Sequence, residues 1–369
     1  MKLKKYLAVG LVACSASAMA QEINLSGFAS AHATQLLGGS SAPEYYSKTT
    51  NFSSFSKFGL NISSNLNSKF SIQSQVLVSG RRTLAGSDQA QWDMHANWLF
   101  LAYRPSENLR FRIGRQLFPA WMVSEYVDVG YMYPWIYTVD TVFELAPFKS
   151  LNGIATDYSF QLNDTQKLTV TVFGGQEAMK IPINQGGSES NQYGSVIGSE
   201  VALTGNGHKL RAMGSYYNVS SVATDTAGVQ GPTLKNNAVR TLTTGYRYDA
   251  NRVMIYAEYG LREGGNGTKM TETGTGNQVS FNKQARVGYV TAGYWFGNIL
   301  PYVNASQNYW NTGTIKGNQD LYSVGLNVKL DEGIMFKTNL GYTISRQGAA
   351  HMERQGDATT ASSGFDVIF

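Results

Sequence analysis

The feature that most constrains this chain is a long series of segments in which apolar and polar residues alternate. In residues 334–345, for example, Ile334 and Leu340 occupy one face of an extended strand, whereas Lys337 and Asn339 occupy the other. Successive side chains of a β-strand point to opposite sides of a sheet, so a period of two is typical of a strand with one apolar and one polar face. The sequence therefore predicts an all-β fold.

The alternation marks sixteen predicted strands. They span residues 23–36, 55–64, 68–81, 94–104, 108–116, 151–162, 166–175, 194–204, 208–219, 238–248, 252–262, 285–296, 299–310, 322–330, 334–345 and 361–369. Segments 94–104 and 285–296 alternate least regularly, so fourteen and eighteen strands are the alternative counts.

The links between these strands are short and long in turn. Short links such as 163–164 and 205–207 hold Asn, Asp and Gly, which are typical of tight turns. Long polar links such as 220–237 and 263–283 lie between them. This order is typical of an antiparallel up-and-down barrel in an outer membrane, with short periplasmic turns and long outer loops. The alternative is a soluble β-sandwich or lipocalin-like barrel, but sixteen strands in one domain fit a wide barrel with a polar lumen better.

The composition suits a wall that meets lipid on one face and water on the other. Charged residues make up 15% of the chain and aromatic residues 12%. A disordered chain would have more charge and fewer aromatic residues. Only the N-terminus has a long apolar run without charge, which excludes a bundle of membrane helices. A closed barrel also pairs every backbone N–H and C=O group internally, as lipid requires.

The N-terminus carries the three parts of a secretory signal peptide. Residues 1–5 are basic, residues 6–14 are apolar, and residues 18–20 form an A-x-A cleavage site. The apolar part is too short to span a membrane as a helical anchor. We therefore expect residues 1–20 to be a signal peptide and residues 21–369 to form the barrel domain.

A second interpretation of the same region is a lipoprotein signal, because residues 11–14 resemble a lipoprotein box with Cys14 as the lipidated residue. Cleavage after Ala20 would instead remove three lysines and the only Cys, which lowers the formal net charge from +5 to +2. Without Cys, and with four scattered His residues, the mature chain is expected to bind no metal and no cofactor. The small net charge also argues against a nucleic-acid partner.

Two segments resemble parts of the Gram-negative outer-membrane porins. Residues 365–369 end in Phe369, with apolar residues two and four places before it, and resemble the closing strand of that family. Residues 109–116 look like the strand that enters the third loop of the general porins. The resemblance implies a homotrimer in contact with outer-membrane lipids, in the outer membrane of a Gram-negative bacterium. It also implies that Phe369 is the signal read by the outer-membrane assembly machinery.

The third long link, residues 117–148, is predicted to form the pore constriction, because in porins the third loop folds into the lumen. It is rich in aromatic residues that could pack inside a barrel. Its acidic residues are Glu125, Asp128, Asp140 and Glu144, and no Lys or Arg precedes Lys149. The alternatives are an ordinary surface loop and one additional hairpin.

Strand phase places many basic side chains on the lumen face. We expect the basic wall of the constriction to comprise Arg81, Arg112, Arg115, Arg211, Arg247, Arg262, Arg286 and Lys337. Arg115 is included through the family resemblance, because Gly114 before it can break the phase. Rings of basic side chains favour anions, and a basic wall opposite an acidic loop would set up a transverse field.

Together these features predict an outer-membrane porin, a water-filled channel for passive diffusion of small hydrophilic solutes and ions, with a preference for anions. The first alternative is a solute-specific channel, for example one selective for phosphate or another anion. A barrel enzyme or an adhesin is less expected, since the chain has no G-x-S-x-G element and no metal-ligand spacing. The sequence therefore predicts no catalytic residue.

Overall fold

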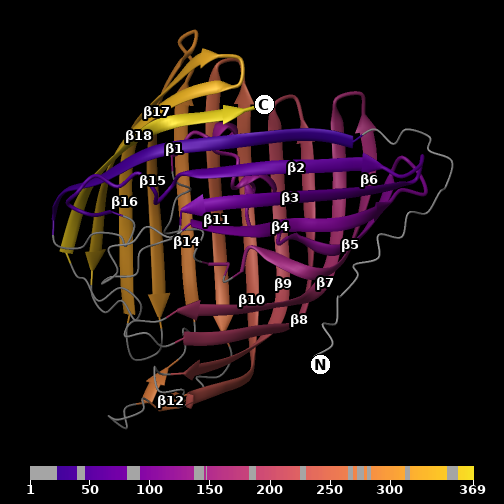
Figure 1. Cartoon of the computed structure of the whole chain (residues 1–369), viewed down its shortest axis with the longest axis horizontal. Coiled ribbons are helices and arrows are strands. Elements are labelled where there is room, and N and C mark those ends of the chain that lie inside the picture. The colour runs from indigo at the N-terminus through magenta and orange to yellow at the C-terminus, as the bar shows by residue number, and fades with distance from the viewer. Residues whose placement is uncertain are drawn as a thin grey trace, which may run out of the picture.

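The computed structural model describes residues 23–39, 46–80, 92–136, 145–146, 148–182, 188–224, 230–264, 269–271, 278–280, 284–311, 316–346 and 356–369. Within these residues sixteen antiparallel strands close into one barrel (Figure 1). The strands are β1 (Ile23–Gly39), β2 (Lys57–Asn65), β3 (Phe70–Gly80), β4 (Trp92–Tyr103), β5 (Leu109–Leu117), β6 (Ser150–Asn163), β7 (Gln166–Pro182), β8 (Ser188–Gly205), β9 (His208–Thr224), β10 (Gln230–Ala250), β11 (Val253–Gly264), β14 (Gln284–Tyr294), β15 (Ile299–Asn311), β16 (Lys316–Asp331), β17 (Ile334–Arg346) and β18 (Gly356–Ile368).

Each strand pairs with its neighbours in the chain, and β1 pairs with β18 to close the ring. All sixteen predicted strands are therefore confirmed, as is the count of sixteen. A separate two-stranded sheet, β12 (Lys269–Thr271) and β13 (Gln278–Ser280), lies in the link between β11 and β14. In Figure 1, β1 to β5 cross in front of the upright strands of the opposite wall, as tilted strands of a barrel do.

Several strands are longer than the alternation predicts. The segment expected at 238–248 is strand from Gln230 to Ala250, and the one expected at 194–204 begins at Ser188. Much of the long link expected at 220–237 is therefore strand as well. Backbone pairing continues here into residues 188–193 and 230–237, where the sequence no longer alternates between apolar and polar residues.

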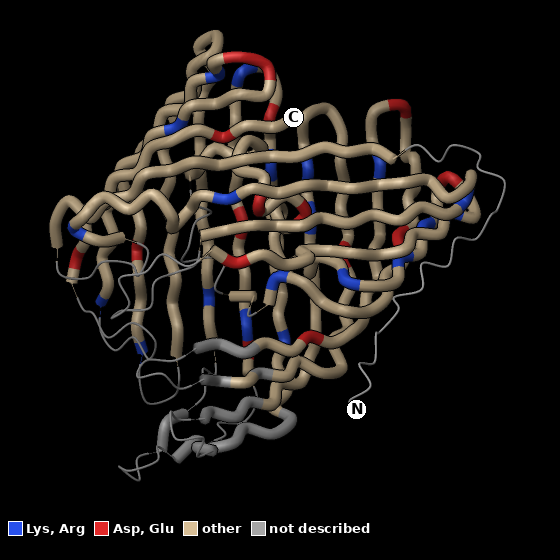
Figure 2. Tube along the Cα trace, in the orientation of Figure 1, with Lys and Arg blue, Asp and Glu red and all other residues tan. Residues whose placement is uncertain are grey.

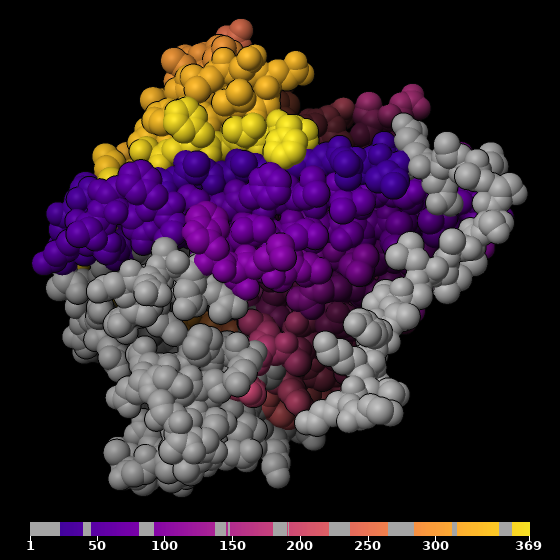
Figure 3. Space-filling model, in the orientation of Figure 1, coloured from indigo at the N-terminus to yellow at the C-terminus, as the bar shows by residue number. Residues whose placement is uncertain are grey.

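The two faces of the wall differ as the phase predicts. On β17, Met335, Lys337 and Thr343 are buried, whereas Leu340 and Tyr342 are exposed. The exposed side chains of the wall include many large apolar residues, as expected of a surface that contacts lipid. The space-filling view shows β1 to β5 as a continuous wall (Figure 3).

The short turns need backbone conformations that favour Asn and Gly. Asn206 and Gly207 have positive φ between β8 and β9, and Gly333 has φ of +77° between β16 and β17. Where the chain closes, Phe369 exchanges two backbone hydrogen bonds with Gly27 at 2.7 and 3.0 Å. The Phe369 ring is exposed and stacks on Phe58 with ring centroids 6.1 Å apart. The C-terminus therefore completes the barrel at the end where the short turns lie.

Among the described residues, none of the helices has the length and apolar character that a transmembrane span requires. The helical residues are two short 3-10 turns, η1 (Ser124–Tyr126) and η2 (Gly130–Met132), both in the link between β5 and β6. This link contributes a large share of the buried apolar cluster of the molecule. Its members in the cluster are Phe118, Ala120, Trp121, Val123, Tyr133, Trp135, Leu145 and Phe148.

Candidate pore constriction

The link between β5 and β6, here called the inner segment (residues 118–149), contacts strands on opposite sides of the barrel. On one side its Val127 carbonyl accepts a hydrogen bond from Lys57 of β2. On the far side, the Trp135 indole N–H donates to Thr291 Oγ1 of β14 at 2.9 Å, and between the two its Pro134 carbonyl accepts from Asn327 of β16. A segment that bonds to both sides of a closed wall passes through its interior, so these contacts identify the inward-pointing side chains of each strand.

Arg211 of β9 binds the start of the inner segment. Its Nη2 donates to the Pro119 carbonyl at 2.6 Å, and its Nη1 donates to the Ala120 carbonyl at 3.0 Å. Two carboxylates lie beside the guanidinium, with Nη2 3.2 Å from Glu200 and Nη1 3.6 Å from Glu258. The Arg211 side chain has no exposed surface. Its charge is therefore used in holding the segment and is not presented to a solute.

Glu258 of β11 takes part in the same contact from the other side. Its carboxylate accepts the backbone N–H of Met122 at 2.8 Å and the Tyr289 hydroxyl at 2.7 Å. A buried carboxylate is tolerated when its lone pairs are paired in this way. Arg211 and Glu258 thus fix residues 119–122 against the β9–β14 wall.

Lys337 of β17 holds η2. Its Nζ donates to the carbonyls of Gly130 and Tyr133, both at 2.6 Å, and lies 3.3 Å from the Trp135 carbonyl. Asp366 of β18 neutralises it at 3.0 Å, and the Lys337 side chain has no exposed surface. The ammonium group thus has four oxygen neighbours, and Lys337 is a second buried anchor of the inner segment.

Asp128 is the third anchor. It forms an ion pair with Lys149, lies 3.7 Å from Lys57 of β2, and accepts a hydrogen bond from Asn97 of β4 at 2.8 Å. Burial alone would raise the pKa of Asp128, but the ammonium groups of Lys149 and Lys57 outweigh burial and hold that pKa below its usual range. Asp128 is therefore a charged, paired group that ties the segment to β2 and β4.

A pair of arginines on β5 is more accessible. Arg110 Nε lies 2.7 Å and Arg112 Nη2 2.9 Å from the carboxylate of Asp157 on β6. Thr171 of β7 donates to the same carboxylate at 2.9 Å. The side chains of Arg110 and Arg112 remain 32% and 16% exposed. Two cations here share one carboxylate, so the cluster carries a positive excess that water and solutes can reach.

Arg247 of β10 and Arg262 of β11 also point inward and touch the inner segment. Arg247 donates to the Tyr126 hydroxyl at 3.2 Å, pairs with Asp249 at 2.8 Å and stacks over Tyr256. Arg262 donates to the Leu145 carbonyl at 3.2 Å. Both expected positions are therefore on the wall that faces the segment, and both are engaged by it.

Arg286 of β14 corrects the expectation that it lies on this wall. Thr291 on the same strand bonds to Trp135 and so points inward, and no irregularity interrupts the pairing between the two positions. Arg286, an odd number of residues away, therefore points outward, and it is exposed. The phase was misassigned because β14 carries small residues on both faces, such as Ala285 inward and Gly288 outward, which blurs the apolar contrast.

The expectation that Arg115 belongs to the basic wall of the lumen is also wrong. It pairs in register with Leu99 of β4, whose exposed side chain lies on the outward face. Gly114 has φ of +130°, yet the register of β5 with β6 stays continuous through it, so the phase does not change. Arg115 instead donates to Glu177 at 2.8 Å and to the Ala96 carbonyl at 3.1 Å.

The two described acidic residues of the inner segment that were expected at the constriction differ in their exposure to water. Asp128 is buried and paired, as above, whereas Glu125 on η1 is exposed. Asp140, Glu144 and the expected basic position Arg81 lie outside the described residues. Figure 2 shows that charges are sparse along the barrel and that basic and acidic positions lie close together at several points.

Sequence reasoning left Lys57 and Lys149 out of the constriction, although both contact Asp128 of the inner segment. The phase of the predicted strand 55–64 does place Lys57 on the lumen face, but phase does not give its contact with the third link, and Lys149 lies beside a strand end, where phase gives no guide. Among the residues that the structure describes, no group of three or more His, Cys, Asp or Glu side chains is placed to hold a metal ion.

The fold is shared with solved outer-membrane barrels. The outer-membrane channel DcaP of Acinetobacter baumannii matches with a TM-score of 0.61 at 11% identity, over 95% of this chain and 97% of that one. The trimer form of OmpT from Vibrio cholerae matches with a TM-score of 0.59 at 12% identity, over 95% and 99% of the two chains.

A third match is the anion-selective porin from Comamonas acidovorans, with a TM-score of 0.54 at 11% identity, over 95% of this chain and 100% of that one. No protein-family model matches the sequence, and no curated protein matches it. At these identities the likeness establishes the fold, which is that of a Gram-negative outer-membrane porin barrel.

Proposed function

We propose that this barrel is a water-filled channel for the passive diffusion of small hydrophilic solutes and ions. The observation that carries the proposal is the inner segment, which Arg211, Lys337 and Asp128 fix inside the barrel through buried ion pairs. Such a segment narrows the lumen at a fixed place. Selection then follows from the width of the opening and from the charges along it, and needs no chemical step.

We further propose a modest preference for anions, carried by the accessible charges alone. Arg110 and Arg112 share the carboxylate of Asp157, and Lys57 and Lys149 share that of Asp128, so each cluster has two cations for one anion. Arg211 and Lys337 are fully buried and add little to the field that a solute meets. The anion selectivity of the Comamonas acidovorans porin is consistent with this proposal but concerns that protein.

The proposal is tested in planar bilayers under a KCl gradient. The native channel is expected to give a reversal potential of the sign for anions, and Arg112→Gln is expected to shift it toward cations. The matched control is Arg240→Gln on β10, which removes an arginine from the outward face. A native reversal potential of the sign for cations would refute the anion preference, and absence of any conductance would refute the channel.

The alternative of a solute-specific channel makes a different prediction in the same bilayer. One solute class, with phosphate as the first probe, would then block the ionic current with saturable affinity while chloride and sugars would not. Arg110 and Arg112 offer guanidinium groups suited to a phosphate, so block that depends on Arg112 would favour this alternative.

The remaining proposals concern assembly. We propose a homotrimer surrounded by outer-membrane lipids, as suggested by the trimer form of OmpT. We also propose that the exposed ring of Phe369 at the closing strand is available to the assembly machinery. Residues 1–20, proposed as a signal peptide, lie outside the described residues. Mass spectrometry of the purified chain gives its first residue, and cross-linking in membranes gives the number of copies.

A further inference from the structure

The seam between β1 and β18 is where the barrel wall closes without a covalent link (Figure 1). Every other pair of neighbouring strands is joined by a turn or a longer link, but β1 and β18 are the first and last strands of the ring. Their pairing also contains an irregularity between Leu36 and Gly38. Separation of these two strands costs only their backbone ladder and the side-chain contacts across it, so the seam is the least restrained pairing of the wall.

One row of inward-facing residues crosses this seam. Ser30 of β1 lies in register with Lys57 of β2 on one side and with Asp366 of β18 on the other. The Ser30 hydroxyl donates to Asp366 Oδ1 at 2.5 Å. His32 of β1 approaches the same oxygen, with its Nε2 3.4 Å away, and its ring lies so close to Gly364 that a Cβ atom there would be 2.5 Å from the imidazole. The carboxylate of Asp366, which is buried, therefore ties β18 to β1 inside the barrel.

The inner segment crosses the seam between Asp128 and Gly130. On the β2 side, the Asp128 carboxylate lies 3.7 Å from the Lys57 ammonium. On the β17 and β18 side, the Gly130 carbonyl accepts a hydrogen bond from Lys337, and a Cβ atom on Gly130 would lie 2.2 Å from Asp366 Oδ1. Two residues span at most about 7 Å of chain. Both sets of contacts can therefore exist together only when β1 is paired with β18.

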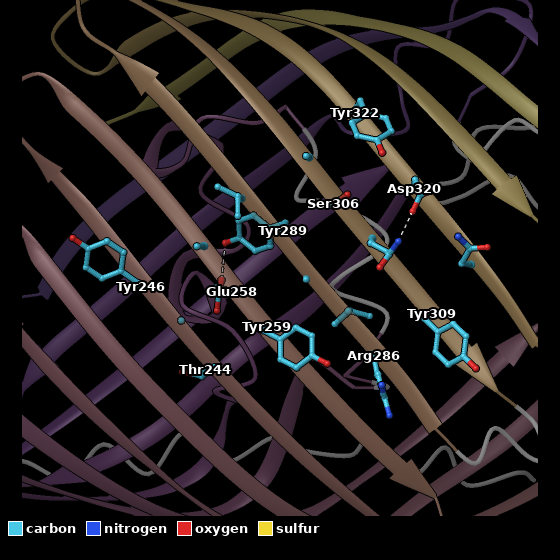
Figure 4. A pocket seen from close by; sticks show the side chains of 18 of the residues that line it. Thr244, Tyr246, Glu258, Tyr259, Arg286, Tyr289, Ser306, Tyr309, Asp320 and Tyr322 are labelled. Atoms are coloured by element: carbon cyan, nitrogen blue, oxygen red, sulfur yellow. Dashed lines mark hydrogen bonds between the residues drawn. The ribbon is translucent and has the colours of Figure 1, made fainter.

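The start of the inner segment is held far from the seam. Glu258 of β11 accepts the backbone N–H of Met122, and it also accepts the Tyr289 hydroxyl of β14 (Figure 4). Four strands lie between β14 and β1 in the ring. Neither β11 nor β14 belongs to the seam, so loss of one of these contacts is expected to loosen the segment without loosening the seam.

We propose that the inner segment is an internal strap across the seam of β1 and β18, held at Asp128 and Gly130, with Asp366 as the group that the strap and both strands share. The strap keeps the seam closed from the inside, and the closed seam fixes the strap. Coupling of this kind is reciprocal, so weakening either partner weakens the other. The constriction is then set only in a barrel whose wall is complete. This device is independent of which ions the channel prefers.

Amide hydrogen exchange of the full mature chain, folded in detergent and followed by mass spectrometry, tests the effect of the strap on the seam. Asp128→Asn should raise the exchange rate of residues 28–36 and 361–368 about tenfold, the effect of one charge-assisted hydrogen bond. The pairing of β9 with β10 in the same molecules is the internal reference and should exchange as in the native chain. Tyr289→Phe, which removes one hydrogen bond from the distant anchor, is the matched control and should leave exchange at the seam unchanged.

Single-channel recording tests the effect of the seam on the strap. Ser30→Ala removes the hydroxyl that links β1 to Asp366 and should raise the current noise, whereas Ser30→Thr keeps a hydroxyl there and should be as quiet as the native channel. Ser362→Ala is the matched control, because it removes a buried, inward-facing hydroxyl of the same seam in the row of Thr34, away from Asp366. It should behave like the native channel.

Native exchange at the seam of Asp128→Asn would overturn the proposal. Equal acceleration in Tyr289→Phe would also overturn it, since the seam would then respond to any loosening of the interior. The same holds for an equal rise in the β9–β10 reference, which would be a global loss of stability. A quiet Ser30→Ala channel would remove the shared role of Asp366 and with it the coupling. The exchange measurements need no ionic current, so they decide the proposal even if the barrel does not conduct.

Discussion

Replacing Lys337 with Met tests whether a buried charge holds the constriction in place. The substitution keeps most of the side-chain volume but removes the ion pair to Asp366 at 3.0 Å and the hydrogen bonds to the carbonyls of Gly130 and Tyr133. It leaves Asp366 charged and buried without its ammonium partner. Removal of one member of a buried pair costs about 3–5 kcal/mol, or about two to four orders of magnitude in the unfolding equilibrium.

The double variant Lys337→Met with Asp366→Asn separates the two consequences of that change. It removes both charges, and since a buried pair replaced as a whole is often close to neutral, the barrel should regain all but about 2 kcal/mol of its free energy of unfolding. The inner segment, however, has lost its anchor in both variants. Single channels of both should therefore show larger current fluctuations than the native protein.

The assays are guanidinium unfolding of the barrel in lipid vesicles and single-channel recording in planar bilayers. Lys329→Met is the matched control, because it removes an exposed lysine from the inner side of β16, close to the short turns. It should change neither unfolding nor current noise. The reasoning is refuted if Lys337→Met matches the native protein in both assays, or if the double variant is no more stable than the single one.

Three further predictions follow from the other contacts of the inner segment. Arg211→Met leaves Glu258 unpaired, so it should lower the free energy of unfolding by about 3–5 kcal/mol while the sign of the reversal potential stays unchanged. The pKa of Asp128 is lowered in the folded protein, so the stabilisation that its charge provides is complete above the unfolded pKa of about 3.9 and is lost as pH falls through the folded pKa. Current noise of the native channel should therefore be constant from about pH 7 to 5 and rise only below about pH 4. The Asp128→Asn channel should be noisy at every pH. Gly130→Ala would place a methyl group 2.2 Å from a carboxylate oxygen on β18 and should lower the unfolding free energy by about 1–3 kcal/mol, whereas Gly214→Ala, with open space around it, should not.

The strands were predictable because each strand of this wall separates lipid from water. That separation imposes a period of two on the sequence, and all sixteen segments found by it are strands in the structure. Their outer ends were not predictable in the same way. In β8 and β10 the ladder of backbone hydrogen bonds continues into residues 188–193 and 230–237, where the sequence no longer alternates between apolar and polar residues.

The candidate site was predictable only in part, because phase reports the face of a residue and not its partner. Arg211 and Lys337 were placed on the correct wall, but the groups that receive their charge are mostly backbone carbonyls of the inner segment. Every residue has such a carbonyl, so no pattern in the sequence marks the ones that are used. Where small residues blur the two faces, as beside Arg286, even the face was misassigned.

The basic residues of the inner wall therefore cannot be added up as a measure of ion selectivity. The two most deeply buried ones, Arg211 and Lys337, are shielded from water by the inner segment and hold this segment in place. A charge that is buried and matched by a carboxylate projects little field into the lumen, whereas a partly exposed one beside a shared carboxylate, such as Arg112, keeps some of its own. The expected selectivity of this channel thus depends on how the charges divide between structure and solvent, and that division is made by the fold of the inner segment.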